Sequence, residues 1–274
     1  MNSDYYLVLG AASEHVQIVL FKTEVDCTSV SILCAQDWLA PSRGTEIMPS
    51  ALNQMLELLD LHPSTITRIA CVSGPGSFTG IRLCLAFGAA LRRGTGALIA
   101  GISFLSALSY EAILKIRLDR KFVIRVITHA RHDLVHGQDF FVDPLTPSEI
   151  PVAISMPEMW SITRAGDGIG KYLGDGYPVR IIGSGVARHM DDLLSVIPSG
   201  ADVKLIEDIT YPSPHSLIKM SLEANYSDVD PEPIYLRQCD AYDNLSSIAL
   251  SRGDSFAEAE RQLEQALAHS ADAI

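Results

Sequence analysis

The stretch that decides the fold of this chain is Gly74-Pro75-Gly76-Ser77-Phe78-Thr79-Gly80. The residues just before it, 68–73, are mostly apolar and hold no glycine or proline, which is typical of a buried strand. The residues after it, 81–91, are apolar nearly all round, which predicts a helix sandwiched between layers. A buried strand that turns through glycines into a buried helix indicates a layered α/β domain.

The residues ahead of this glycine-rich loop predict three strands and a helix. Runs of β-branched or large apolar side chains at 5–9, 16–21 and 30–35 predict consecutive antiparallel strands joined by short turns. Apolar side chains then recur every three or four residues along a helix that begins near Pro49 and ends before His62. These side chains are Met48, Ala51, Leu52, Met55, Leu58 and Leu59.

Beyond the loop, strands and helices continue to alternate. We expect a strand over 97–102 and a helix over 104–116, after which the charged residues 117–121 interrupt the pattern and it restarts. The elements predicted there are strands over 122–128, 134–142, 179–182 and 203–206, a helix up to Val196, helices over 216–224 and 254–268, and loops over 144–157 and 165–176.

This order, in a chain of 274 residues, predicts an α/β protein with two domains. We place an N-terminal α/β domain over 1–109 and a smaller second α/β domain over 110–241, whose last helix packs back on the first. Residues 242–274 form a C-terminal extension to which no role is assigned.

The charge of the chain argues against nucleic-acid binding by this protein alone. It carries 33 Asp and Glu against 21 Lys and Arg, a net charge of −12, with no long basic block. Phosphate contacts need a clustered positive patch, so any contact with RNA is expected to come through a partner.

Cysteine usage and hydropathy predict a cytoplasmic protein. The five cysteines are odd in number and include no C-x-x-C pair, so neither a disulfide framework nor a zinc knuckle is expected. No secretory signal opens the chain. The longest uncharged stretch, 94–110, contains three glycines and four Ser or Thr residues, so we expect no membrane span.

The glycine-rich loop is the sharpest candidate for chemistry. Backbone N–H groups at a helix N-terminus suit an anion, and Arg82 in the first turn could neutralise one or pair with a carboxylate. However, the loop has neither the Walker A lysine nor the G-x-G-x-x-G spacing, and Ser77 lacks the G-x-S-x-G context of a nucleophile. A tight structural turn and a phosphate or partner contact therefore both stay open.

No other cluster predicts catalysis or a cofactor. His129, His132, Asp133 and His136 are dense enough to hold a metal, but they fall at a hairpin turn, and strand residues alternate faces. We interpret them as exposed polar turn residues and expect no metal. The acidic pairs have no visible partner, so no general acid and base can be nominated.

The loop and its surroundings resemble the TsaB (YeaZ) family of the glycoprotease-like, actin-like ATPase superfamily. The resemblance extends over about residues 5–241, through Arg43-Gly44 with Pro49, the turn Gly183-Ser184-Gly185 and the late Tyr235-Leu236-Arg237. It implies two related α/β domains with the actin-like or sugar-kinase-like ATPase fold.

The resemblance also implies a function. Family members are non-catalytic scaffolds in tRNA threonylcarbamoyladenosine modification, a step of tRNA processing. They form a heterodimer with the TsaD transferase through first-domain helices, and TsaE, an ATPase, joins them. A homodimer in isolation stays open. Mapped onto this chain, the interface would comprise Met48, Leu52, Met55, Leu59 and the small-residue stripe Gly80, Cys84 and Gly88.

Three departures from the family pattern bear on catalysis. Gly10-Ala11-Ala12 stands where the family has Asp-Thr-Ser, His129 replaces the Asp of an Asp-Ala-Arg turn, and Ser184 replaces the Asp of Gly-Asp-Gly. Each change removes an acidic group expected near a magnesium-phosphate site. We therefore expect no cofactor and no ATP hydrolysis; the alternative is a nucleotide-binding phosphotransferase or a glycoprotease-like enzyme.

Overall fold

The computed structural model describes residues 4–24, 29–40, 43–117, 120–131, 133–145, 150–236 and 261. The chain divides into two compact units, Met1–Leu236 and Arg237–Ile274. All elements named below belong to the first unit. The helix predicted over 254–268 lies outside the described residues, apart from Arg261.

The first sheet has five strands: β1 (Asp4–Gly10), β2 (His15–Thr23), β3 (Val30–Leu39), β4 (Ile66–Gly74) and β5 (Leu98–Ser103). Their order is β3-β2-β1-β4-β5. The first three strands are antiparallel, whereas β1, β4 and β5 run parallel. The parallel pairs are joined through helices, as such crossovers require.

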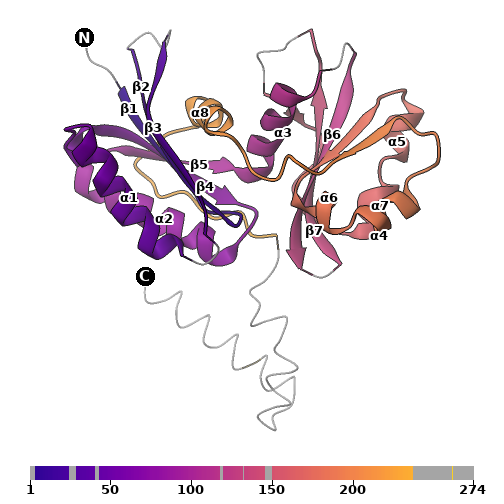
Figure 1. The fold of residues 1–274 in the computed structure, drawn as a ribbon, viewed down its shortest axis with the longest axis horizontal. Coiled ribbons are helices and arrows are strands. Elements are labelled where there is room, and N and C mark those ends of the chain that lie inside the picture. Colours follow the sequence, from indigo (N-terminus) through magenta and orange to yellow (C-terminus); the bar gives the residue numbers. More distant parts are fainter. Residues whose placement is uncertain are drawn as a thin grey trace. The chain divides into compact units, whose positions relative to one another are not determined.

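Alternation along these strands divides the core between the two faces of the sheet. Leu7 and Leu9 of β1 belong to a cluster with α1 (Gly44–Leu58) and α2 (Phe78–Thr95). Tyr6 and Val8 belong to a second cluster with α3 (Phe104–Lys115) and α8 (Pro214–Leu222). The helices α1 and α2 therefore cover one face of the sheet (Figure 1).

The start of α1 corrects the prediction. The helix begins at Gly44 rather than near Pro49, which lies inside it. Proline there has no N–H to donate to the carbonyl of Thr45, but both residues are exposed, so water can serve that carbonyl. Burial of Met48 helps to stabilise the turn that contains the proline.

The second sheet repeats the strand order of the first. It comprises β6 (Phe122–Arg131), β7 (Leu134–Val142), β8 (Val152–Ala153), β10 (Val179–Ile182) and β11 (Val203–Ile206), with β9 (Glu158–Ser161) also paired to β7. From the edge the order is β8-β7-β6-β10-β11, with β6 antiparallel to β7 and parallel to β10. The predicted fold class, two α/β units of related topology, is confirmed.

The helices around the second sheet are short, and sequence periodicity missed two of them. They are α4 (Ile162–Asp167), α5 (Gly170–Gly174), α6 (Ser184–Arg188) and α7 (Met190–Val196). The predicted loop over 165–176 contains the end of α4 and all of α5, because Ala165, Ile169 and Tyr172 are buried against the sheet. The predicted loop over 144–157 includes the short strand β8.

The two sheets share one core in the described unit. Residues of both sheets join the cluster around α3 and α8, and α8 contacts β1, β2 and β5. The predicted boundary at residues 109 and 110 stays a prediction, because residues 1–236 form one compact unit that holds both sheets. None of the described helices is both long and apolar enough to cross a membrane.

A buried carboxylate ties α8 to α3. Glu111 is 3% exposed, and its Oε2 accepts hydrogen bonds from the N–H of Ser213 at 2.8 Å and from the hydroxyl of Ser216 at 2.6 Å. Lys115 lies 3.3 Å from its Oε1. Burial alone would raise the pKa of Glu111, but the hydrogen bonds from both serines and the charge of Lys115 outweigh it, so the pKa is lowered.

We expect Glu111→Gln to reduce the free energy of unfolding at pH 7 by about 1–3 kcal/mol, because a charge-assisted hydrogen bond is lost in a buried place. A lowered pKa stabilises the fold above the ordinary glutamate value and ceases to do so as the pH falls through the lowered value. The difference between wild type and variant should therefore shrink below pH 4.5 in urea titrations. Glu223→Gln, which removes the charge of an exposed ion pair with Lys219, is the control. A difference in free energy of unfolding between wild type and Glu111→Gln that did not change with pH would contradict this account.

Candidate functional site

The glycine-rich loop joins the end of β4 to the start of α2. Ser77 caps the helix: its hydroxyl accepts a hydrogen bond from the N–H of Gly80 at 3.3 Å. The N–H of Ser77 itself donates to the carbonyl of Ala12 at 2.8 Å. Two N–H groups of the loop are thus satisfied within the chain, which favours the structural-turn interpretation.

Two glycines let the loop lie directly on the turn between β1 and β2. A Cβ atom on Gly76 would lie 2.1 Å from the carbonyl oxygen of Ala12, and one on Gly80 would lie 1.8 Å from that of Ala11. Both distances are shorter than any real contact. The absence of a side chain at Gly76 and Gly80 is therefore what allows the loop to lie on the backbone of Ala11 and Ala12.

The side chains around the loop are also engaged within the chain. The Arg82 guanidinium carbon lies 3.9 Å from the centroid of the Phe78 ring, and Arg82 Nε donates to the Tyr235 hydroxyl at 2.9 Å. The N–H of Ile234 donates to the carbonyl of Ser73 at 2.7 Å. Arg82 therefore contributes a cation–π contact and a latch to Tyr235, a pairing that sequence reasoning missed. Thr79 is exposed and Pro75 is buried.

Tyr235 belongs to the segment 227–236, which holds no helix and which we call the strap. Ser227 exchanges two backbone hydrogen bonds with Ile99 of β5. Asp230 accepts hydrogen bonds from Arg92 at 2.9 Å and Arg93 at 2.6 Å, both near the end of α2. The strap thus holds both ends of α2, and Arg237 of the Tyr-Leu-Arg motif lies outside the described residues.

The structure places most of the predicted interface residues in the core of this chain. Met48, Leu52 and Met55 are at most 4% exposed and pack between α1 and the first sheet. Cys84 is fully buried, and a Cβ on Gly88 would lie 2.4 Å from Cys71 Sγ of β4. The small-residue stripe thus lets α2 approach its own sheet, although it was predicted to face a partner. Leu59 is partly buried in the same cluster.

The faces of α1 and α2 that point away from the first sheet are the ones exposed to a partner. On α2, Ala86 and Ala90 are exposed, and Leu83 and Phe87 are partly so. On α1, Leu58 is 82% exposed. It lies at the C-terminal end of an exposed helix surface that is otherwise polar and largely uncharged. The exposed α1 residues are Thr45, Glu46, Pro49, Ser50, Asn53, Gln54, Glu57 and Leu58.

The end of the turn between β1 and β2 and the start of β2 contact residues of the second half. Gln17 is 3% exposed, and its Nε2 donates to the carbonyl of Pro212 at 2.8 Å. Next to it, the His15 ring stacks on Tyr211 with centroids 3.7 Å apart, and Glu14 pairs with Arg188 of α6 at 3.2 Å. Glu14 of the turn and His15 and Gln17 of β2 therefore contact residues between 188 and 212 of the same chain.

The other two departures from the family pattern meet at one place. The Ser184 hydroxyl accepts a hydrogen bond from the N–H of His129 at 3.0 Å. His129 pairs with Val135 across the hairpin and His136 with Thr128, so the two imidazoles start on opposite faces of the sheet. His132 lies outside the described residues, and among those that are described no three His, Cys, Asp or Glu side chains gather as metal ligands do.

The two sheets have the same strand order, and a glycine-rich loop joins a parallel strand to its helix, so the chain is an α/β protein built from two related sheets. Two solved structures are similar, each covering 85% of this chain and 100% of its own at 15% identity. One is YeaZ from Pseudomonas aeruginosa, with a TM-score of 0.65; the other, with 0.63, is described as an uncharacterised protein similar to the peptidase YeaZ from that organism.

The sequence itself matches one family model. That model is TsaD, tRNA N6-adenosine threonylcarbamoyltransferase, and it matches residues 39–142, which include the loop, α1 and α2. No curated protein sequence matches the chain. The chain is therefore similar in fold to YeaZ and, over residues 39–142, similar in sequence to the TsaD family model, which agrees with the resemblance that its loop predicted.

Proposed function

We propose that this chain is a non-catalytic scaffold subunit of the tRNA threonylcarbamoyladenosine machinery. In this role it binds and supports a TsaD-like transferase subunit, together with a TsaE-like ATPase, in the cytoplasm. The observation that carries the proposal is the contact between the glycine-rich loop and Ala11 and Ala12, in which the N–H of Ser77, a group that an anion would need, donates to the carbonyl of Ala12.

Electrostatics support the non-catalytic part of the proposal. An ATPase of this fold class needs carboxylates to hold a metal beside the phosphates. Position 10 is glycine, and position 184 is a serine whose hydroxyl accepts from the chain's own backbone. The phosphotransferase and glycoprotease-like alternatives have no such group in these places, so no observation favours them.

The exposed faces of α1 and α2 are the proposed partner surface. Small side chains at Ala86 and Ala90 allow another helix to approach closely, and the partly buried Leu83 and Phe87 supply apolar area. A chain of net charge −12 is a poor RNA ligand, so positive charge for tRNA would come from other subunits.

Two experiments test the proposal together. The gene should restore threonylcarbamoyladenosine in cells depleted of their own TsaB, and the tagged protein should capture the TsaD-like subunit of its organism. Rescue with capture supports the scaffold role. Failure of both overturns it, and capture without rescue leaves a binding protein outside this modification.

We expect Ala90→Arg to weaken binding of the TsaD-like subunit at least tenfold, because a long charged side chain would hold the two helices apart. The melting temperature should stay close to that of wild type, since the position is exposed. Ala187→Arg, on an exposed position of α6, is the matched control. Isothermal titration calorimetry measures both; equal affinities for the two variants would exclude this face.

A further inference from the structure

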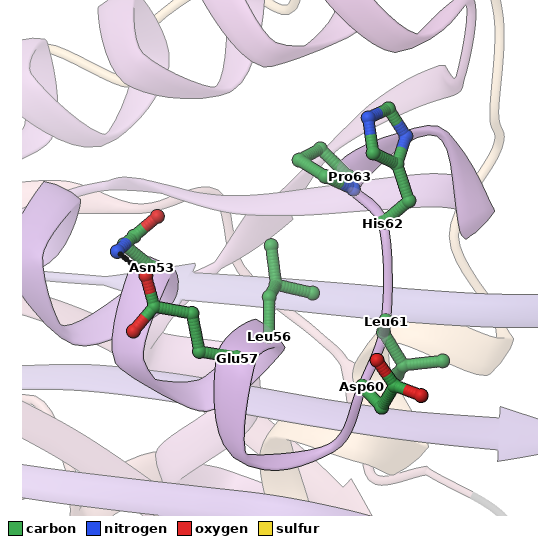
Figure 2. A pocket seen from close by; sticks show the side chains of 7 residues that line it. All are labelled: Asn53, Leu56, Glu57, Asp60, Leu61, His62 and Pro63. Atoms are coloured by element: carbon green, nitrogen blue, oxygen red, sulfur yellow. Dashed lines mark hydrogen bonds between the residues drawn. The ribbon is translucent and has the colours of Figure 1, made fainter.

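We propose that a groove at the C-terminal end of α1 receives a lysine or arginine side chain of the protein partner. The proposal rests on the scaffold function above and adds the chemistry by which the partner is recognised. The groove has a volume of about 490 Å³ and lies between the last turns of α1 and the segment that leads into β4. Figure 2 shows its lining, with Asn53 and Glu57 on one side, Asp60 and His62 on the other, and Leu56 between them.

The charge of the groove selects a cation. Glu57 and Asp60 both line it, and neither carboxylate takes part in an ion pair with the described part of the chain. Asn53 Nδ2 donates to Glu57 Oε1 at 2.7 Å, which holds that carboxylate in place and leaves Oε2 for a ligand. No basic side chain occupies the last turn of α1, so the negative end of the helix dipole adds to the same field.

The shape of the groove suits a long side chain better than a bare ion. Leu56 and Leu61 supply an apolar floor along which the methylene stem of a lysine or arginine can lie, with its charged end between the carboxylates. The N–H of Leu61 donates to the carbonyl of Leu56 at 2.9 Å, which closes the helix end and fixes this floor.

Asp60 occupies a backbone conformation that a glycine would adopt more easily. Its φ is +51°, in the left-handed region at the position where helices commonly end on glycine. An aspartate here places a carboxylate beside the groove. A variant with glycine would remove the charge while keeping the backbone path, so charge and fold can be tested separately.

The groove is continuous with the proposed partner surface. Leu58, which is 82% exposed, is the last residue of α1 and directly follows Glu57. A partner segment that covers Leu58 and inserts a basic side chain next to it would bury apolar area and neutralise two carboxylates at once. The net charge of −12 also steers a basic surface toward this chain.

The test measures the Kd of the purified full chain for the TsaD-like subunit of its organism by calorimetry. For Glu57→Lys with Asp60→Lys we expect about tenfold or greater weakening, and for Asp60→Gly a smaller loss with an unchanged or higher melting temperature. Wild-type affinity should fall as salt is raised, and less steeply in the double variant. Glu207→Lys with Asp208→Lys, an exposed acidic pair that follows β11 and lies outside the proposed partner surface, is the matched control.

The outcomes separate this inference from the function on which it rests. If wild type binds and the double variant binds equally well, the groove is overturned while the scaffold role stands. Equal losses for the groove variant and for the Glu207 and Asp208 control variant would show a general charge effect and also overturn the groove. If wild type does not bind, the scaffold proposal fails, and the groove fails with it.

Discussion

Gly80→Ala is expected to lower the melting temperature by about 6–12 °C, the largest effect predicted for a single methyl group in this chain. The added Cβ would lie 1.8 Å from the carbonyl oxygen of Ala11, so either α2 or the turn between β1 and β2 must shift. Overpacking against a rigid backbone costs on the order of 3 kcal/mol. Differential scanning calorimetry measures the change.

Gly94→Ala is the matched control on the same helix. A Cβ at this position would meet nothing within 4 Å, and helix propensity favours alanine by about 1 kcal/mol. The control should therefore leave the melting temperature unchanged or raise it. If Gly80→Ala and Gly94→Ala changed the melting temperature equally, the close contact between the loop and the turn that joins β1 to β2 would be contradicted.

Asp139→Ala is expected to destabilise the second sheet by about 3–5 kcal/mol, because it leaves a buried arginine without its partner. Arg125 and Asp139 are each 3% exposed in their side chains, and Arg125 Nε lies 2.7 Å from Asp139 Oδ1. Arg125 also donates to the carbonyls of Ala165 and Gly168, and the Tyr172 hydroxyl donates to Asp139 Oδ2 at 2.7 Å. Burial and this hydrogen bond raise the pKa of Tyr172.

Chemical denaturation measures this loss, and two variants calibrate it. Glu14→Ala removes one side of an exposed ion pair with Arg188 and should cost less than about 1 kcal/mol. Replacing Arg125 and Asp139 together by methionine and leucine should cost less than Asp139→Ala alone, because no buried charge is left unpaired. A double variant as unstable as the single one would contradict this reasoning.

The sequence predicted elements best where one periodicity ran over many residues. The strands of the first sheet, α2 and α3 lie within a few residues of their predicted positions. The short helices α4 and α5 were missed, because five or six residues are too few to display a helical period. Their positions depend on burial of Ile169 and Tyr172 against the second sheet, which only tertiary structure reveals.

The candidate site shows a different limit. The spacing of Gly80, Cys84 and Gly88 correctly marks a close-packed face of α2, but spacing cannot tell whether the neighbour is a partner or the chain's own sheet. The structure assigns that face to the sheet. The latch between Arg82 and Tyr235 spans 153 residues of sequence, so no local pattern could have revealed it.

Because α2 packs tightly on β4, the buried thiols of Cys71 and Cys84 can be used to detect local separation of the helix from the strand. Burial raises the pKa of Cys71 to about 12 and that of Cys84 well above its ordinary value, and both side chains are inaccessible. Alkylating reagents require an exposed thiolate, so these cysteines should react only when the helix lifts from the strand. In a chain whose other three cysteines are replaced by serine, the alkylation rate would measure the free energy of that opening.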